Sequence, residues 1–411
     1  MRAYAPLAAL LTASAISITG NTLTMLAIPW FVLQTTGSAT KTGLAAFFTL
    51  TAFVISSALS GPLVDRIGPR RVSVIADLAS GVSVLAIPLL FHTTGLPFWA
   101  LLGLVFSGAL LDAPGDAARG VIFPELVART GMRMERAMSW YDGTGRAARM
   151  VGAPLAGVLI AVLGTANVLF VDAATFGVSA LLVAVLVPRA AAAAGGEEHE
   201  PYLAALRGGA EFLWNDRLTR AIVLMVVVTN MLDAAMGTVL MPVYADRVLD
   251  SVVALGLIGG AFGVGATIGT VIFGVLGHRL PRVRTLVIGF SIGGAFRFFF
   301  LPADPGLTLI LVLVPLAAIG IGMVNPIFGT FLYERIPERK RARVFGVMSA
   351  AVMSAAPLGA LLGGYFVAWF GVRETMLAFG VVYLAFTLSP LVVPAWRDVA
   401  PREAAAAPLR S

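Results

Sequence analysis

Long apolar stretches separated by short polar ones dominate the pattern along this chain of 411 residues. A helix needs about 20 apolar residues to cross the roughly 30 Å of hydrocarbon in a bilayer. The separators are short and carry charges or turn residues, as in Pro-Ala-Asp-Pro-Gly at 302–306. We therefore expect an all-α membrane protein. Its transmembrane helices are predicted at residues 7–33, 42–64, 72–91, 97–118, 140–163, 166–187, 218–245, 252–276, 285–301, 307–333, 344–370 and 373–394.

The longest separator divides these twelve predicted helices into two sets of six. We assign an N-terminal bundle to 1–187, a cytoplasmic linker to 188–217, a C-terminal bundle to 218–394 and a cytoplasmic tail to 395–411. An offset of 213 residues aligns Gly43 with Gly256, and an offset of 207 aligns Gly157 with Gly364. An ordered series of such matches predicts two pseudo-symmetric halves. Because six is even, both halves begin on the same side of the membrane.

The distribution of basic residues predicts the orientation. With both termini inside the cell, only Lys41, Arg247 and Arg373 lie in or beside external loops, whereas the internal loops are rich in arginine. Cytoplasmic loops carry such an excess of Lys and Arg. We expect a multi-pass protein of the cytoplasmic membrane with both termini in the cytoplasm.

Composition indicates that lipid surrounds much of the protein surface, and it excludes several classes of function. Hydrophobic residues make up 58% of the chain and charged residues only 12%, against about 25% charged in soluble domains. Cysteine is absent, so disulfides and thiolate chemistry are excluded. No phosphate-binding loop or catalytic triad pattern occurs. We therefore expect no enzyme, cofactor or metal. A nucleic-acid partner is not expected either, because the basic residues behind the net charge of +7 gather in short loops between apolar runs.

The sharpest motif is Gly-Pro-Leu-Val-Asp-Arg-Ile-Gly-Pro-Arg-Arg at 61–71. It resembles the loop signature of the major facilitator superfamily, G-x-L-x-D-R-x-G-x-R-R, and the degenerate second copy at 274–284 has His278 in place of the acid. The resemblance implies a twelve-helix transporter whose loop aspartate docks on the eleventh helix when the cytoplasmic side is closed. The loop arginines would pair with nearby carboxylates and lipid phosphates. The gating residues implied are Gly61, Asp65, Arg66, Gly68, Arg70 and Arg71.

A second motif lies in the fifth predicted helix. Gly152, Pro154 and Gly157 resemble the G-P-x-x-G segment of drug–proton antiporters in that family, although Ala153 stands where those proteins usually have glycine. The alternative is a kink that serves helix packing, which glycine and proline supply anyway. The segment 123–127, placed after the fourth helix, resembles the branch that includes macrolide and other multidrug exporters. The arginine often found within the fourth helix of drug antiporters is missing from 98–112.

Ionisable residues inside the spans are functional candidates, because they are costly in lipid. Asp233 lies near the middle of the seventh predicted helix beside Asn230, and Asp112 lies past the middle of the fourth. Asn21 and Asn325 occupy similar depths in the first and tenth. The resemblance implies that these four helices line a central cavity. For both acids, proton handling and a structural hydrogen bond remain open, with Asp233 the first choice.

Other charged residues are secondary candidates. We expect a local ion pair between Asp116 and Arg119, and we expect Asp77 to pair with the arginines of the gating loop. The role of Asp172 stays undecided.

Two further expectations concern spacing and depth. Asp142 and Arg146 are four residues apart, the spacing of a helical ion pair. Arg297 stands close enough to the external end of its helix to extend toward the membrane surface.

These observations favour a secondary transporter that exports small amphipathic compounds, driven by protons and working by alternating access. One alternative is a transporter of another cargo, for siderophore or lipid export or for solute uptake. An alternative of a different class is a membrane sensor or scaffold that transports nothing. The partners expected are a small-molecule substrate, protons and the bilayer, and we expect the chain to act as a monomer.

Overall fold

The computed structural model of the chain describes residues 4–188, 210–211, 213–393 and 396, so most of the predicted linker and tail lies outside the described residues. Within the described residues the prediction of an all-α fold is confirmed, and twelve helices there are long and apolar enough to cross a membrane. In the first six spans these are α1 (Ala5–Thr36), α2 (Ala39–Ile67), α3 (Pro69–Thr93), α4 (Phe98–Thr130), α5 (Met134–Leu163) and α6 (Thr165–Leu186). The seventh span joins α8 (Arg217–Ala235), η1 (Met236–Leu240) and α9 (Met241–Arg247), and the eighth is α10 (Val252–Leu276). A short turn, η2 (Gly277–Arg279), leads to the ninth span, which joins α11 (Arg282–Phe290), η3 (Ser291–Ala295), α12 (Phe296–Phe300) and η4 (Leu301–Ala303). The last three are α13 (Leu307–Arg335), α14 (Glu338–Phe370) and α15 (Val372–Thr387) with α16 (Ser389–Val392).

Several helices extend beyond their apolar stretches. The fourth helix, expected to end at 118, continues to Thr130, where Gly131 ends it in the left-handed conformation. Residues 123–127 therefore lie inside α4 and not after it. The difference arises because hydropathy marks only the part of a helix that lipid surrounds, whereas the backbone hydrogen-bond ladder continues into polar surroundings.

Two spans are interrupted by π-helical turns. In the seventh span η1 follows α8 directly, and in the ninth η3 precedes α12. Such turns are rare and often occur at functional sites. Gly293 in η3 allows a close approach to α13, because a Cβ there would lie 2.4 Å from the backbone nitrogen of Ile321.

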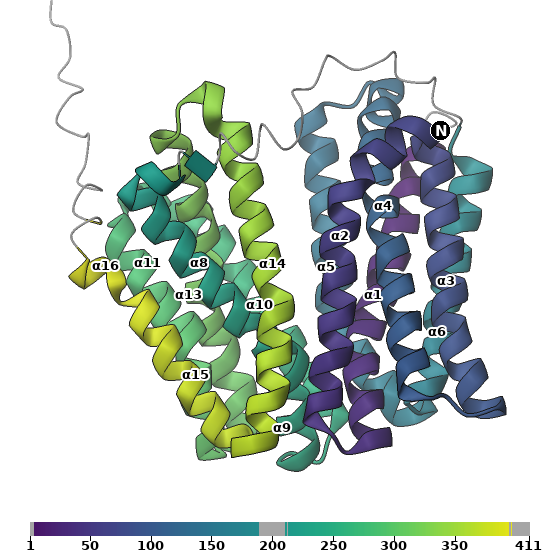
Figure 1. Cartoon of the computed structure of the whole chain (residues 1–411). Helices are drawn as coiled ribbons and strands as arrows, with labels where there is room; N and C mark the ends of the chain where they lie inside the picture. Colours follow the sequence, from purple (N-terminus) through teal and green to yellow (C-terminus); the bar gives the residue numbers. More distant parts are fainter. Residues whose placement is uncertain (1–3, 189–209, 212, 394–395, 397–411) are drawn as a thin grey trace, which may run out of the picture.

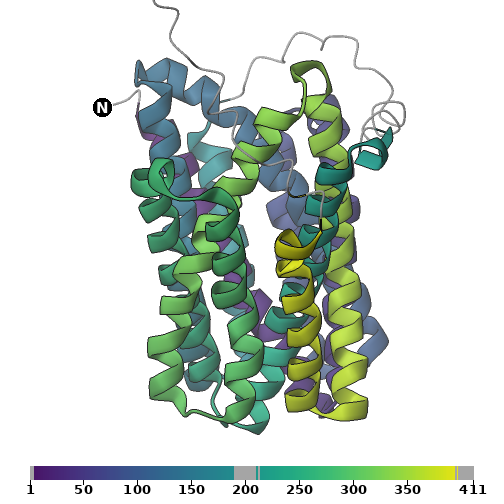
Figure 2. The ribbon, with the colours of Figure 1, turned by 90° about the vertical axis from the view of Figure 1, so that its left-hand side faces the viewer.

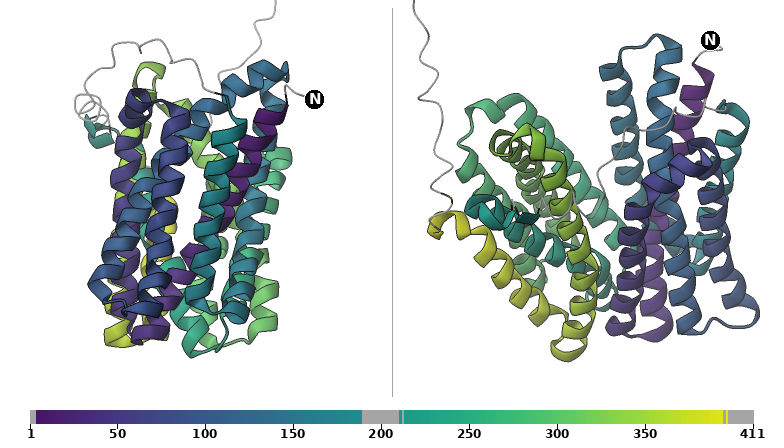
Figure 3. Two further views of the ribbon diagram at one scale, coloured as in Figure 1. Left: turned by 90° about the vertical axis from the view of Figure 1, so that its right-hand side faces the viewer. Right: turned by 45° about the horizontal axis from the view of Figure 1, so that its top comes forward.

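The helices gather in two groups, α1–α6 and α8–α16 (Figure 1). We call the end at which α1 begins the N-terminal face and the other end the opposite face. Figures 2 and 3 show the helices of each group running side by side between these two faces. The groups meet toward the opposite face, near α9, and diverge toward the N-terminal face (Figure 1).

Glycines allow close contacts between the groups. A Cβ on Gly43 of α2 would lie 2.9 Å from Cα of Gly364 of α14. A Cβ on Gly256 of α10 would lie 3.1 Å from Cα of Gly157 of α5. All four glycines stand in the parts of their helices nearest the opposite face. The helices are therefore held close at that end because no side chain separates the backbones.

Polar contacts join the groups at the same end. The Gln34 amide donates to Asp246 Oδ1 at 2.6 Å, and Arg247 Nη2 donates to the carbonyl oxygen of Gly37 at 3.2 Å. Together with the glycine contacts, these bonds close the opposite face.

We expect Gly256→Ala to lower the stability of this structure. Its new Cβ would lie 2.5 Å from the carbonyl oxygen of Ala153, and overpacking of this kind costs about 1–3 kcal/mol. Gly263→Ala on the same helix is the control, because nothing lies within 4 Å of its Cβ position. Thermal unfolding in nanodiscs should give a lower midpoint for Gly256→Ala and an unchanged or higher one for Gly263→Ala. Equal midpoints would contradict the packing described.

Candidate functional site

A cavity lies between the two helix groups. Its first part, which we call the polar compartment, encloses about 570 Å³ and is lined by α1, α5 and α10, with one residue from α4. Two acids and two arginines line it: Asp116, Asp142, Arg146 and Arg149. The compartment is thus polar but carries balanced formal charge.

The second part, the apolar compartment, encloses about 340 Å³ and shares Gly259 with the first. Leu255 and Phe262 of α10 line it, whereas Thr267, further along α10, lines the polar compartment. Because α10 starts at the opposite face, the apolar compartment is the deeper one. The first, fourth, seventh and tenth spans contribute to the cavity, and the fifth, eighth and ninth do so as well.

Asp233 faces the apolar compartment and forms an ion pair with Arg297 of α12. Tyr383 of α15 donates to Asp233 Oδ2 at 3.5 Å. The guanidinium of Arg297 also lies 5.2 Å from the ring centre of Phe262 and 5.5 Å from that of Phe298. The expectation that Arg297 extends toward the membrane surface is wrong, because a carboxylate at similar depth offers a partner that lipid cannot. Tyr383 thus joins the cluster of Asp233 and Arg297, and no sequence motif indicated it.

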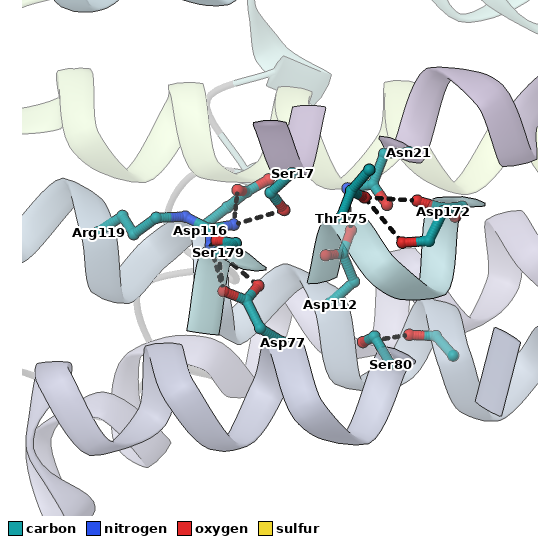
Figure 4. A network of polar contacts seen from close by, with 11 residues as sticks. Ser17, Asn21, Asp77, Ser80, Asp112, Asp116, Arg119, Asp172, Thr175 and Ser179 are labelled. Carbon is teal, nitrogen blue, oxygen red and sulfur yellow. Dashed lines mark hydrogen bonds and ion pairs between the residues drawn. The ribbon is translucent and has the colours of Figure 1, made fainter. Parts of the chain in front are cut away.

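Asp112 lies against α1, where the Asn21 amide donates to its Oδ2 at 2.8 Å (Figure 4). Its other oxygen, Oδ1, is buried and has no hydrogen-bond partner. Among the described residues no arginine or lysine forms an ion pair with it. Asp112 therefore differs from Asp233, whose charge Arg297 balances.

Arg119 is the centre of a buried network that joins four helices (Figure 4). Its Nη1 contacts Asp77 Oδ1 at 2.9 Å, and its Nη2 contacts Asp116 Oδ1 at 2.7 Å. Hydroxyls of Ser17 and Ser179 complete the network. The expectation that Asp77 pairs with the gating-loop arginines is wrong. Asp77 lies two turns inside α3, where it points into the helix group and only 1% of its side chain is exposed.

Asp172 is fully buried on α6. Its oxygens accept hydrogen bonds from Thr24 of α1 and, at 3.0 Å, from Thr175. Gly20 of α1 makes this approach possible, since a Cβ there would overlap the Thr175 hydroxyl. Sequence alone did not reveal the two threonines, because single threonines in apolar helices are common and usually bond to their own backbone.

Of the five residues predicted for the cavity, only Asp233 lines one of the two compartments. Asp112 and Asn21 lie outside both linings, bonded to each other. Asn230 donates to the backbone of Val226 and, like the exposed Asn325, does not line either compartment. Asp142 and Arg146 line the polar compartment, but within the described part of the chain no ion pair joins them. Both side chains instead face the cavity from adjacent turns of α5.

The predicted gating loop lies at the N-terminal face but is mostly helical: Gly61, Asp65 and Arg66 stand in the last turns of α2, Gly68 separates the helices, and Arg70 and Arg71 stand in the first turn of α3. Asp65 and Arg66 are exposed, and the described residues offer neither of them an ion-pair partner. Arg70 donates to the backbone oxygen of Ala184 in α6. Gly68 ends α2 with φ of 90°, a conformation that glycine adopts without strain. The loop is thus tied to its own helix group through Arg70, and Asp65 is free to meet another partner.

The motif of the fifth span packs against both neighbours. A Cβ on Gly152 would lie 2.9 Å from Cβ of Thr22 in α1. Pro154 faces Gly260 of α10, where a Cβ would lie 2.5 Å from the proline ring, and Gly157 meets the start of α10. The segment therefore supplies close contacts within its own group and across to the other group.

Helix number, arrangement and cavity define a polytopic transporter fold. Among the described residues, no three His, Asp or Glu side chains gather to hold a metal ion. The family model described as Major Facilitator Superfamily matches residues 10–250 and 223–411. The chain belongs to this superfamily.

Within this superfamily, the chain is similar in sequence to known efflux proteins. The chain is 31% identical to the multidrug efflux pump Tap of Mycolicibacterium fortuitum over 401 residues, covering 96% of this chain and 97% of that protein. It is 19% identical to macrolide efflux protein A of Streptococcus pyogenes, covering 91% and 92%. The expected resemblance to the multidrug and macrolide-efflux branch is confirmed. A crystal structure of a mutant of the nucleoside transporter NupG superposes with a TM-score of 0.81 at 13% identity, covering 94% and 98% of the two chains, and shares the fold.

Proposed function

We propose that this transporter exports small amphipathic compounds from the cytoplasm in exchange for protons. The observation that carries the proposal is the cavity between the helix groups, which has an apolar end for a ligand and carboxylates in its wall. The similarity to multidrug and macrolide efflux proteins over nearly the whole chain supports the direction of transport. Protons are the proposed coupling ion and a monomer the proposed unit.

We infer an alternating-access cycle in the cytoplasmic membrane with both termini inside. The excess of arginine at the N-terminal face supports this orientation. The structure then corresponds to the inward-open state, since the contacts between Gln34 and Asp246 and among the four glycines close the other side. Those glycines are the residues that the repeat offsets align, Gly43 with Gly256 and Gly157 with Gly364. This supports two pseudo-symmetric halves, 1–187 and 218–394, joined by the linker 188–217.

Asp112 is the proposed coupling acid in this cycle. A coupling group must take up a proton on one side and release it on the other, and a carboxylate with no cation partner is best suited to exist in both forms. Asp233, the first choice from sequence, is paired with Arg297. We assign Asp233 to ligand binding in the apolar compartment. Asp172 and Asp116 become the next candidates for proton coupling.

A substrate screen tests this function. The chain, expressed in a drug-susceptible host that lacks its own exporters, should lower accumulation of several amphipathic compounds, and a protonophore should abolish the effect. Accumulation that rises on expression would favour an uptake transporter, and a siderophore or lipid in place of drugs would favour another cargo. No change for any compound, with the protein present in the membrane, would favour a sensor or scaffold.

We expect Asp65→Asn to reduce transport up to about tenfold without loss of folded protein. The carboxylate is exposed here, so its removal costs little stability. In the closed state it would dock at the start of α14, because a helix N-terminus stabilises a negative charge by up to about 1–2 kcal/mol. The measurement is substrate flux per folded molecule. Glu135→Gln, which changes an exposed acid on α5, is the control and should leave flux unchanged. Unaltered flux in Asp65→Asn would remove the latch from the mechanism.

A further inference from the structure

Arg297 has unused hydrogen-bonding capacity. A guanidinium carries five N–H donors and no acceptor. Among the described residues, Asp233 is the only hydrogen-bond and ion-pair partner of Arg297, through Nη2, and Nε is buried without a partner. The rings of Phe262 and Phe298 attract the cation but take no conventional hydrogen bond from it. The wall of the apolar compartment therefore presents donors without acceptors.

Arg119 shows how this protein pairs an arginine inside the other helix group; its Nε is also buried without a partner, so the two arginines differ in the contacts of their Nη nitrogens. It contacts two carboxylates, those of Asp77 at 2.9 Å and Asp116 at 2.7 Å, and two serine hydroxyls. Arg297 contacts one carboxylate. Unlike Arg119, Arg297 lines a compartment with room for a ligand. A second acid for Arg297 could thus come from the transported compound.

We propose that Arg297 binds an acidic oxygen of the substrate, such as a carboxylate, enolate or phenolate, while the apolar part of the substrate fills the compartment. The inference rests on the proposed function and specifies its substrate class. With the oxyanion bound, one arginine would face two acids, as Arg119 does. Asp233 acts as a positioning residue, because its ion pair holds the guanidinium at the wall.

A cationic ligand fits the same wall less well. The guanidinium of Arg297, held on Asp233 Oδ1, would repel a ligand cation that approached the same carboxylate. The remaining lining supports a ring-containing body, with Met25, Met236 and Phe262 among the residues around it. Flexible methionine side chains adapt to ligands of different outline.

Three probes with one ring system and different head groups test the proposal: naphthylacetate, naphthylacetamide and naphthylethylamine. Equilibrium binding to the full chain in nanodiscs, corrected with empty nanodiscs, should show the carboxylate binding at least about tenfold tighter than the amide. Arg297→Gln combined with Asp233→Asn keeps the site neutral and should reduce carboxylate affinity to that of the amide. Arg129→Gln, which removes an arginine outside both compartments, is the control and should keep the preference.

Arg297→Lys provides a second variant in case the neutral pair fails to fold, and it should keep a weakened preference for the carboxylate. Tightest binding of the amine, equal binding of all three probes, or no binding above empty nanodiscs would overturn the proposal. So would a carboxylate preference that stays undiminished in the neutral pair or in Arg297→Lys. Drug export without head-group preference refutes this inference alone. Carboxylate-selective binding without any export refutes the proposed function and leaves this inference standing.

Discussion

Asp112→Asn is expected to abolish pH-driven uphill transport while leaving substrate exchange at equilibrium measurable. The amide resembles the protonated carboxyl, so the helix groups can still change conformation, but the variant can no longer respond to the proton gradient. Local structure should survive, because the new side-chain oxygen can accept the bond that the Asn21 amide now donates at 2.8 Å. A purely structural acid would behave differently, since asparagine would preserve its hydrogen bond and leave coupling intact.

Flux driven by a pH gradient, measured beside equilibrium exchange, separates these cases. Asp233→Asn belongs in the same experiment, because the sequence ranks Asp233 first and the ion pair with Arg297 argues for a ligand role. That variant should weaken substrate binding and still couple. If Asp112→Asn accumulates substrate against its gradient as the parent chain does, the proton site is elsewhere, and Asp172 and Asp116 are tested next.

Arg119→Leu is expected to destabilise the protein by about 3–5 kcal/mol, because it leaves Asp77 as a buried charge without its partner. Only 1% of each of these two side chains is exposed. Removing both buried charges with Asp77→Asn and Arg119→Leu should recover much of the loss, since the acid that remains, Asp116, is half exposed and can be solvated. The free energy of unfolding, measured in mixed micelles as denaturing detergent is added, reports both effects.

Arg129→Leu is the matched control on the same helix. Arg129 pairs with Glu125 at 2.6 Å, but 45% of the Arg129 side chain is exposed, and exposed pairs contribute at most about 1 kcal/mol. A loss as small for Arg119→Leu as for Arg129→Leu would show that the buried network does not stabilise the fold.

The spans could be predicted from sequence because lipid imposes a simple requirement on each of them alone. Twenty apolar residues, a charged separator and a glycine such as Gly131 are local signals. Helix ends were harder to predict, because α4 and α14 extend beyond their apolar stretches and hydropathy there does not distinguish helix from loop.

Most ion-pair partners of the charged residues could not be predicted from the sequence. Arg297 and Asp233 are 64 positions apart, and Arg119 and Asp77 are 42 apart. Which face of one helix meets which face of another depends on packing of the whole bundle, so depth along a span identified the acids but not their partners. The local pair of Asp116 with Arg119 was accessible because three residues separate neighbours on one helix face. Docking of Asp65 involves a second conformation, and it stays a prediction.

Transport into proteoliposomes with an imposed pH gradient tests the central claim most directly. With the N-terminal face outward and the lumen acidic, the account predicts that a compound found in the screen accumulates inside above its external concentration. Each pH unit corresponds to about 1.4 kcal/mol, or tenfold accumulation per exchanged proton, and a protonophore should release the excess. Uptake that only reaches the external concentration, and is indifferent to both gradient and protonophore, would contradict proton-coupled export.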